Sequence, residues 1–328
     1  MTLHLILKFP VDYSIAGGTT DTITEHKQLC EAKNRLIWGQ GSQRTSEGVS
    51  DKNKRKLIDQ ISNGVNTYTL FLANNKGNRE LYVGKMTNIY GRGKIPIGSP
   101  LTQFIPNYYA STVGTATDQN NVFVDVCTFF RVDDKYIGDI TLEKNGDRVI
   151  DVRNSSSIFF VNITEDLEKL LIEMLTNPES NFQYQVEQEV VPDAVTVADK
   201  PKSKPFKTSG SGTSSYKRDP KTSKTAIVTA KFKCEIDDTH EEFISRVTGK
   251  NYVEAHHLIP MEYQDDYTNR IDVEANIVSL CVCCHKKLHH GTSAIIKPII
   301  EKLYDDRKGR LKDCDIELTK TKLFSYYD

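Results

Sequence analysis

The sequence predicts an α+β protein with two domains joined by a linker. Segments with strand composition recur through the first 186 residues, a stretch rich in Lys, Ser, Gly and Pro follows, and cysteine and histidine cluster in the last third. A chain of 328 residues has room for two domains. We therefore expect domains at 1–186 and 216–328, separated by a linker at 187–215.

The first domain is expected to be mixed α and β, and rich in strands. Two helices are expected, at Asp51–Ile61 and Thr164–Leu175, the second because leucines recur at helical spacing. The sequence NNKGN at 74–78 predicts a hairpin turn. The strand candidates are runs of β-branched and aromatic residues: Leu3–Phe9, Asn66–Asn74, Glu80–Ile89, Asn121–Val132 and Ser157–Ile163.

Basic residues are concentrated in one segment, 200–224, called the basic segment below. It carries eight Lys or Arg residues against Asp219 alone, whereas residues 1–199 carry 20 basic and 25 acidic residues. Such a run is either a solvated linker or a flexible arm that contacts phosphates next to a nucleic-acid-binding domain. The sequence leaves both interpretations open.

The composition also bears on the compartment. No apolar run approaches the roughly 20 residues that span a bilayer. The start, MTLHLILKFPVDYS, lacks the basic region and cleavage site of a signal peptide. Seven cysteines, mostly clustered, fit a metal site in a reducing compartment better than a disulfide framework. A cytoplasmic protein with no membrane association is expected.

The second domain is expected to begin with a helix, because Asp219 can cap a helix that has Pro220 in its first position. Two short strands and two helices should follow. The strands are Asn251–Leu258 and Asn276–Cys281, and the helices are His285–His290, stopped by Gly291, and Ser293–Lys312. The motif region is thus predicted to run strand, loop, strand, helix.

Spacing separates the cysteines and histidines into two groups, the first of which suits zinc. Cys281 and Cys284 form a C-x-x-C pair, the usual half of a tetrahedral zinc site. Cys234 and His240 lie just upstream and are the candidates for the other two ligands. The alternative is that these are buried cysteines that pack as small hydrophobic residues. We favour a structural Zn²⁺ site.

The remaining histidines suit a second cation. His285 and His289 are spaced i, i+4 and therefore share a helix face. His256 and His257 are adjacent on an expected strand, so their side chains point to opposite sides. One of the two can bind a cation together with His285 while the other acts on water as a base.

These residues resemble a known family. The sequence HHLIP (256–260), then Asn276, then the zinc-type pair followed directly by His285, with His289 four residues on, is similar to the HNH nuclease motif of the ββα-metal fold. The resemblance covers about residues 216–291. It implies a DNA-cleaving domain with a structural zinc and a catalytic divalent cation such as Mg²⁺, Mn²⁺ or Ni²⁺.

The resemblance also implies roles for individual residues. His257 would be the general base and Asn276 its orienting residue, while His256 and His285 would bind the catalytic cation. In the colicin-type branch a further helix histidine binds the cation, and His289 occupies that position here. Many family members lack it, so His289 could instead contact a phosphate. A zinc-stabilised DNA-binding regulator without catalysis is the alternative from another class.

The first domain is expected to choose the target. Aromatic residues in expected loops could stack on an extruded or modified base, although core packing is the commoner fate of any aromatic residue. The domain faintly resembles the PUA-like group, which includes EVE and ASCH domains and would imply a barrel. The candidate pocket residues are Trp38, Tyr82, Tyr108 and Tyr109.

The leading hypothesis is a modification-dependent (type IV) restriction endonuclease. Its substrate would be double-stranded DNA, for example with modified cytosine, and a homodimer would suit double-strand cleavage. An HNH nuclease of unmodified DNA, of the conventional restriction or mobile-element kind, is the other enzymatic hypothesis.

Overall fold

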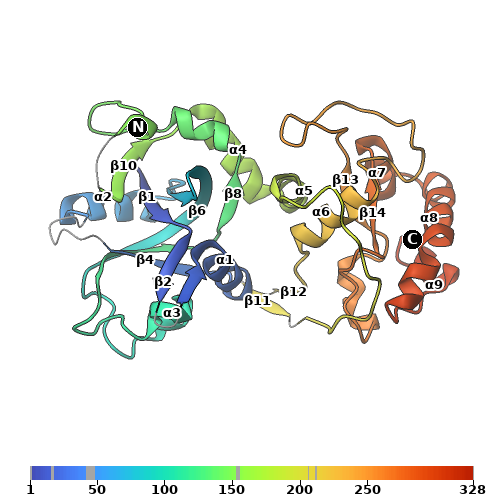
Figure 1. Cartoon of the computed structure of the whole chain (residues 1–328), viewed down its shortest axis with the longest axis horizontal. Helices are drawn as coiled ribbons and strands as arrows, with labels where there is room; N and C mark the ends of the chain where they lie inside the picture. The colour runs from blue at the N-terminus through green and yellow to red at the C-terminus, as the bar shows by residue number, and fades with distance from the viewer. Residues whose placement is uncertain are drawn as a thin grey trace. The chain divides into compact units, whose positions relative to one another are not determined.

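The computed structural model describes residues 2–15, 18–41, 49–152, 156–205, 207–210 and 213–327. They form two compact units (Figure 1). Unit 1 comprises Met1–Ile172 and Thr208–Gly212, and unit 2 comprises Glu173–Lys207 and Thr213–Asp328. The predicted α+β class is confirmed, because unit 1 is rich in strands and unit 2 is mainly helical.

The boundary between the units differs from the predicted end of the first domain at 186. Helix α5 (Pro178–Gln188) packs against α6 (Pro220–Thr229) and so belongs to unit 2. Phe182 and Val186 of α5 join a small hydrophobic core with Ala226, Ile227 and Ile277. Apolar contacts, which local sequence patterns do not reveal, therefore set the boundary.

Unit 1 is built on one mixed sheet. Strands β1 (His4–Pro10) and β5 (Tyr68–Asn75) are parallel, and the other pairs are antiparallel. The sheet order is β4-β7-β6-β5-β1-β10-β9, with β8 also paired to β6. The remaining strands are β4 (Leu36–Gly41), β6 (Asn78–Gly91), β7 (Asn120–Val126), β8 (Phe130–Val132), β9 (Thr141–Leu142) and β10 (Ile158–Asn162).

Shorter elements complete unit 1. The helices are α1 (Thr22–Lys33), α2 (Asp51–Ser62), α3 (Asn107–Ala110) and the first part of α4 (Glu165–Thr176), which continues into unit 2 from Glu173, with 3₁₀ turns at Pro100–Phe104, Asp134–Asp139 and Val149–Asp151. Strands β2 (Asp12–Ile15) and β3 (Gly18–Asp21) pair with each other, and β11 spans Thr208–Gly210. Asp21 caps α1 by accepting from the backbone N–H groups of Ile23 and Thr24.

The hairpin predicted at 74–78 is confirmed. It joins β5 to β6, and Lys76 and Gly77 adopt positive φ values of 51° and 95°. The Asn74 side chain accepts a hydrogen bond from the Gly77 N–H at 3.0 Å, which closes the turn. The strand expected at 121–132 is instead two strands, β7 and β8, which pair with different parts of the long strand β6.

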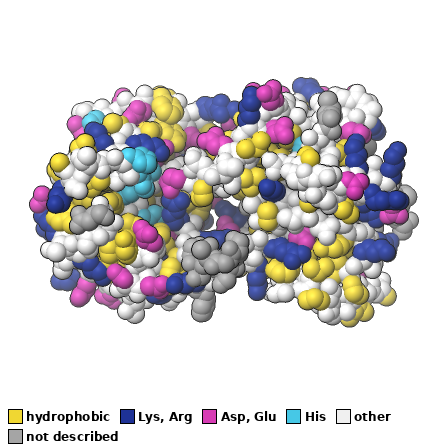
Figure 2. All heavy atoms as spheres, turned by 180° about the vertical axis from the view of Figure 1, so that it is seen from behind, with side chains coloured by type: hydrophobic (Ala, Val, Ile, Leu, Met, Phe, Trp, Pro, Cys, Tyr) yellow, Lys and Arg dark blue, Asp and Glu magenta, His cyan; other side chains and the backbone are white. Residues whose placement is uncertain are grey.

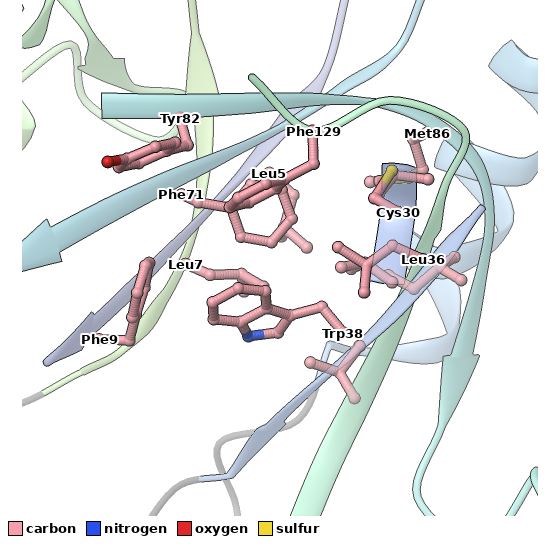
Figure 3. Packing of buried hydrophobic residues seen from close by; sticks show 14 of the residues in the cluster. Leu5, Leu7, Phe9, Cys30, Leu36, Trp38, Phe71, Tyr82, Met86 and Phe129 are labelled. Atoms are coloured by element: carbon pink, nitrogen blue, oxygen red, sulfur yellow. The ribbon is translucent and has the colours of Figure 1, made fainter. Parts of the chain in front are cut away.

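Trp38 lies in the core of unit 1, on β4, and not in the open loop that the sequence suggested. Its side chain is 2% exposed. Its ring centroid lies 3.6 Å from that of His26. It also lies 4.6 Å from the ring centroid of Phe9 and 4.8 Å from that of Phe71, and both of these rings are labelled beside it in Figure 3. The surrounding aliphatic and aromatic residues enclose the indole on several sides, so its main contribution is apolar packing.

We predict that Trp38→Ala lowers the free energy of unfolding of unit 1 by about 3–5 kcal/mol, because it leaves a large cavity in this core. Tyr13→Ala is the matched control, since Tyr13 is 47% exposed and its removal should change the stability by about 0.5 kcal/mol or less. Urea denaturation followed by circular dichroism measures both. A Trp38→Ala protein of wild-type stability would contradict the core placement.

Unit 2 contains the predicted strand, loop, strand, helix order. Strand β13 (Glu254–His257) pairs antiparallel with β14 (Ile277–Leu280), and α7 (Val282–His290) follows directly. Asp219 caps α6 as expected. Helices α8 (Ser293–Asp313) and α9 (Lys320–Phe324) cover the motif, and β12 (Thr213–Ser215) and a 3₁₀ turn at Met261–Asp266 complete the unit.

The part of the predicted linker up to Lys207 belongs to unit 2 and forms ion pairs within it. Asp199 forms an ion pair with Arg310 at 2.6 Å, and Lys202 pairs with Glu274 at 2.9 Å. Lys204 and Lys207 both pair with the exposed Asp265. Exposed ion pairs contribute little to stability. Lys204 and Lys207 can therefore leave Asp265 and bind another anion at little cost in free energy.

Charges of both signs are interspersed over the face drawn in Figure 2. Within the described ranges, no helix has the length and apolar character needed to cross a membrane.

Candidate metal centres and catalytic cavity

Three cysteines and one histidine of unit 2 converge on one point. The ligand atoms of Cys234, His240, Cys281 and Cys284 all lie within 4.8 Å of one another. The two thiols of the C-x-x-C pair belong to the first turn of α7, where the Cys281 sulfur accepts from the Cys284 N–H at 3.4 Å. Cys283 between them is exposed and points outside this group.

The spacing of these atoms suits zinc. Nδ1 of His240 lies 3.5 Å from Sγ of Cys281 and 3.6 Å from Sγ of Cys284. A tetrahedral ion with usual Zn–S and Zn–N bond lengths places such a pair about 3.6 Å apart. The four residues can therefore hold a metal ion such as Zn²⁺.

The electrostatics of the thiols favour a cation at the same point. Burial opposes ionisation of Cys234, yet backbone N–H groups and His240 bring the pKa of its thiol down to about 7. Burial and the neighbouring sulfurs raise the pKa values of Cys281 and Cys284. Three adjacent thiols do not ionise together unless a cation offsets their charge, and a divalent metal supplies that charge.

A second group of histidines lies in the same unit. Ligand nitrogens of His256, His285 and His289 also fall within 4.8 Å of one another. Nε2 of His289 lies 3.0 Å from Nε2 of His285. Two nitrogens at adjacent positions of an octahedral ion, each bound at about 2.1 Å, are about 3.0 Å apart. The pair therefore fits an octahedral divalent cation, and imidazole ligands favour ions such as Ni²⁺ over Mg²⁺.

The protonation states of these histidines suit metal binding. Burial, followed by the proximity of His285 and His289, holds the pKa of His256 well below its usual value. Burial and His285 likewise lower the pKa of His289. Both rings are therefore neutral at pH 7, which is the form that binds metals.

Glu254 fixes the orientation of His285. Its carboxylate lies 2.5 Å from Nδ1 of His285. A carboxylate only accepts, so Nδ1 carries a proton, and in the neutral ring the lone pair is then on Nε2, the atom 3.0 Å from Nε2 of His289. Glu254 stands two residues before His256 on β13, and both side chains therefore lie on the same side of the strand.

The histidines open onto a cavity of about 440 Å³. Figure 2 shows histidine side chains at the surface of unit 2, with Lys and Arg side chains beside them. The cavity walls contain the histidine group, the positively charged side chain of Arg218, and apolar and aromatic side chains. The lining residues that matter below are Arg218, His256, His257, His285, His289 and Tyr327.

His257 has a buried partner that the sequence did not suggest. Its Nε2 lies 2.8 Å from Oδ1 of Asp272, and both side chains are almost fully buried. Burial opposes the ionisation of Asp272, but His257 and Arg270 hold its pKa below the usual value. Asp272 is therefore a carboxylate that accepts from Nε2–H and leaves Nδ1 of His257 free to take a proton.

Asn276 is placed differently from expectation. It was expected to orient His257 directly, yet its side-chain hydrogen bonds go to the backbone of the loop between β13 and β14. Its Oδ1 accepts from the Ile259 N–H at 2.8 Å, and its Nδ2 donates to the carbonyls of Ile259 and Ile271 at 3.0 and 2.9 Å. These hydrogen bonds join Ile259 and Ile271 of the loop to Asn276. They also provide partners for the polar atoms of a buried amide, which are rarely left without one.

Arg218 brings a positive charge to the cavity. Its guanidinium stacks on the ring of Phe182 at 3.8 Å and pairs with Glu179 at 2.7 Å. Phe182 and Glu179 both lie on α5, the helix of unit 2 that precedes the motif region in the sequence. A guanidinium held in this way is oriented and still offers free N–H donors to a phosphate.

The four aromatic residues proposed for a base pocket have different surroundings. Tyr82 is 7% exposed, stacks on Phe129 at 5.3 Å and donates to Glu80 at 2.8 Å. Trp38 and Tyr82 are thus core residues, in contrast to the expected open pocket. Tyr109 accepts from the Gly39 N–H at 2.9 Å. Tyr108 and Tyr109 are partly exposed.

Sequence reasoning missed several residues around the cavity. Glu254 could have been found from its strand spacing to His256. No local pattern indicates Asp272, Arg218 or Tyr327. Asp272 and Tyr327 meet their histidine partners, and Arg218 joins the cavity wall, only through tertiary contacts.

Comparisons with known proteins add little. No protein-family model matches the sequence, and no curated protein matches it. One solved structure, the type IV phosphorothioation-dependent restriction endonuclease ScoMcrA, is weakly similar, with 12% identity and a TM-score of 0.25. The match covers 93% of this chain and 50% of that one, so the chain spans about half the length of that protein. A likeness at this level does not establish a shared fold.

Proposed function

We propose that this chain is a metal-dependent HNH endonuclease that hydrolyses phosphodiester bonds in DNA. One observation carries the proposal: three histidines whose ligand nitrogens lie within 4.8 Å of one another line an open cavity together with His257 and Arg218. The strand, strand, helix arrangement that presents them, next to a zinc-type cluster, supports the HNH assignment.

In this proposal His256, His285 and His289 hold the catalytic cation. The cation, when bound, offsets the negative charge that develops on the phosphate and the leaving oxygen. Glu254 keeps His285 in the tautomer that presents Nε2.

His257 acts as the general base. Its Nδ1 accepts a proton from the attacking water, while Asp272 accepts from Nε2–H and stabilises the protonated ring. Asn276 acts through the backbone, because it fixes the loop that follows His257. This role differs from the direct orientation of the base that the family resemblance implies.

Arg218 contacts a non-bridging phosphate oxygen of the substrate. Its position in the cavity wall and its stacking on Phe182 support this role. The lysines of the basic segment contact the DNA backbone further away, where phosphates replace Asp265 as their partner.

Unit 1 selects the DNA, and we propose that it reads a modified base as in type IV restriction enzymes. Its separate core supports an independent recognition function. Tyr108 suits base stacking best among the four aromatic candidates, because it is partly exposed and lies 5.8 Å from the ring of the exposed Tyr13.

The test is digestion of plain, methylated, hydroxymethylated and otherwise modified phage DNA by the purified, zinc-loaded chain. Reactions contain Mg²⁺, Mn²⁺ or Ni²⁺, and EDTA provides the control. We expect cleavage of at least one modified DNA, with Mn²⁺ or Ni²⁺ more effective than Mg²⁺ because the ligands are imidazoles.

The outcomes separate the hypotheses. Equal cleavage of all DNAs would contradict modification reading and favour a nuclease of unmodified DNA. Binding of DNA with no cleavage under any of the three metals would contradict the nuclease and favour a zinc-stabilised regulator.

A further inference from the structure

Tyr327 reaches the histidine group from a segment 71 residues away from His256 in the sequence. Its hydroxyl oxygen lies 2.8 Å from Nε2 of His256 and 2.9 Å from the carbonyl oxygen of Leu258. The preceding residue anchors this segment, because Tyr326 donates to Asp266 at 2.8 Å and stacks on Tyr263 at 3.9 Å. The hydroxyl of Tyr327 is therefore held in place by its neighbour.

The single proton of this hydroxyl determines the direction of both contacts. Leu258 is fully buried, and its carbonyl oxygen can only accept. A buried carbonyl left without a donor costs about 1–3 kcal/mol, so the proton of Tyr327 points to Leu258. The contact with His256 then needs its proton from the ring, which means that Nε2 of His256 carries the hydrogen.

A neutral imidazole has one N–H and one lone pair. With the hydrogen on Nε2, the lone pair of His256 is on Nδ1. Only a nitrogen with a lone pair binds a metal ion, and the partner of the other nitrogen decides which one that is. The hydrogen bond with Glu254 favours the other tautomer for His285, in which Nδ1 carries the hydrogen.

We propose that Tyr327 is a positioning residue that holds His256 in the Nε2–H tautomer and so makes Nδ1 the atom offered to the catalytic cation. The inference rests on the proposed function, in which His256 is a metal ligand. It assigns a task to a tyrosine outside the motif, and it predicts that two of the three ligands use different ring nitrogens.

The test is Tyr327→Phe, which keeps the ring and removes only the hydroxyl. Tyr304→Phe is the matched control, because that hydroxyl also donates to a backbone carbonyl, that of Leu318 at 3.1 Å, and lies outside the group of residues that line the cavity. Two readouts are taken on the zinc-loaded chain. ¹H–¹⁵N NMR of the imidazole nitrogens, assigned with His256→Gln, reports the tautomer, and calorimetry with Ni²⁺ reports the affinity.

We expect His256 to be the Nε2–H tautomer in the wild type and a mixture of tautomers in Tyr327→Phe. The Kd for Ni²⁺ should rise about tenfold in Tyr327→Phe, as is usual when the hydrogen-bond partner of a ligand is lost, and should stay within about twofold in Tyr304→Phe. An Nδ1–H tautomer in the wild type, or unchanged Ni²⁺ affinity in Tyr327→Phe, would overturn the inference.

His256→Gln separates this failure from failure of the metal site. If His256→Gln weakens Ni²⁺ binding while Tyr327→Phe does not, the metal site stands and the role of Tyr327 is wrong. If His256→Gln binds Ni²⁺ as tightly as the wild type, His256 is not a ligand. The proposed ligand set is then wrong, and so is the proposal that Nδ1 of His256 binds the cation.

Discussion

Cys281→Ser is expected to remove the zinc and to abolish cooperative folding of unit 2. Cys234, Cys281 and Cys284 lie inside one hydrophobic core, together with residues of β14, α7, α8 and α9. Without the metal ion, the bonds that join Cys234 and Cys284 of this core to each other and to His240 are lost. Structural zinc sites contribute on the order of 10 kcal/mol, which is comparable to the whole stability of a domain.

Serine is the informative substitution at this position. Cys281 is also the N-cap of α7, where its side chain accepts from the Cys284 N–H. Serine is a good N-cap residue, so the helix start survives and only the metal ligand is lost. Cys283→Ser is the matched control, because Cys283 is exposed and lies outside the ligand group.

The measurements are zinc content by mass spectrometry and thermal unfolding by circular dichroism. The wild type and Cys283→Ser should contain one zinc ion per chain and show the transition of unit 2. Cys281→Ser should lack both. If the cysteines were only small hydrophobic residues, Cys281→Ser would cost a few kcal/mol at most, and the wild type would contain no zinc.

The motif of unit 2 could be predicted from sequence because its spacings are local. A C-x-x-C pair at a helix start and histidines at i, i+4 come together whenever the helix forms, and α7 does form. The strands on either side of the motif loop were expected at 251–258 and 276–281, and the structure pairs β13 with β14 there, with His256 opposite Val278. Local spacing was therefore enough to predict the order of the elements and the two groups of possible metal ligands.

Trp38 shows why the first unit was harder to predict. The sequence WGQG resembles a loop, because two glycines flank a polar residue. In the structure Gly39 belongs to β4, and a Cβ atom there would come within 2.7 Å of the Asn120 side chain and 2.9 Å of Phe123. Glycine is thus required by the close approach of β7, which no local pattern reveals.

Helix α1 illustrates a second limit. Its sequence is mostly polar, and only Thr22, His26 and Cys30 are buried, so the apolar stripe that identifies a helix is almost absent. Contacts between distant segments are likewise invisible in the sequence. Asp272 lies 15 residues from its partner His257, and Tyr327 lies 71 residues from its partner His256.

His257→Ala is expected to reduce the rate of DNA cleavage by about 10²- to 10⁴-fold, the usual contribution of a general base. The substitution leaves the other three cavity histidines in place, so Ni²⁺ affinity should be close to that of the wild type. Asp272 keeps its partner Arg270 at 2.5 Å, which limits the cost of leaving that carboxylate buried. Zinc content and circular dichroism check that the fold is intact.

Two further measurements distinguish a base from a residue that only supports the structure. His290→Ala is the matched control, because His290 is exposed at the end of α7 and lies outside the ligand group, so its cleavage rate should match the wild type. Added imidazole should restore part of the activity of His257→Ala, because a free base can enter the cavity left by the side chain. Rapid cleavage by His257→Ala without imidazole would show that another group accepts the proton, and the assignment of the base would then be wrong.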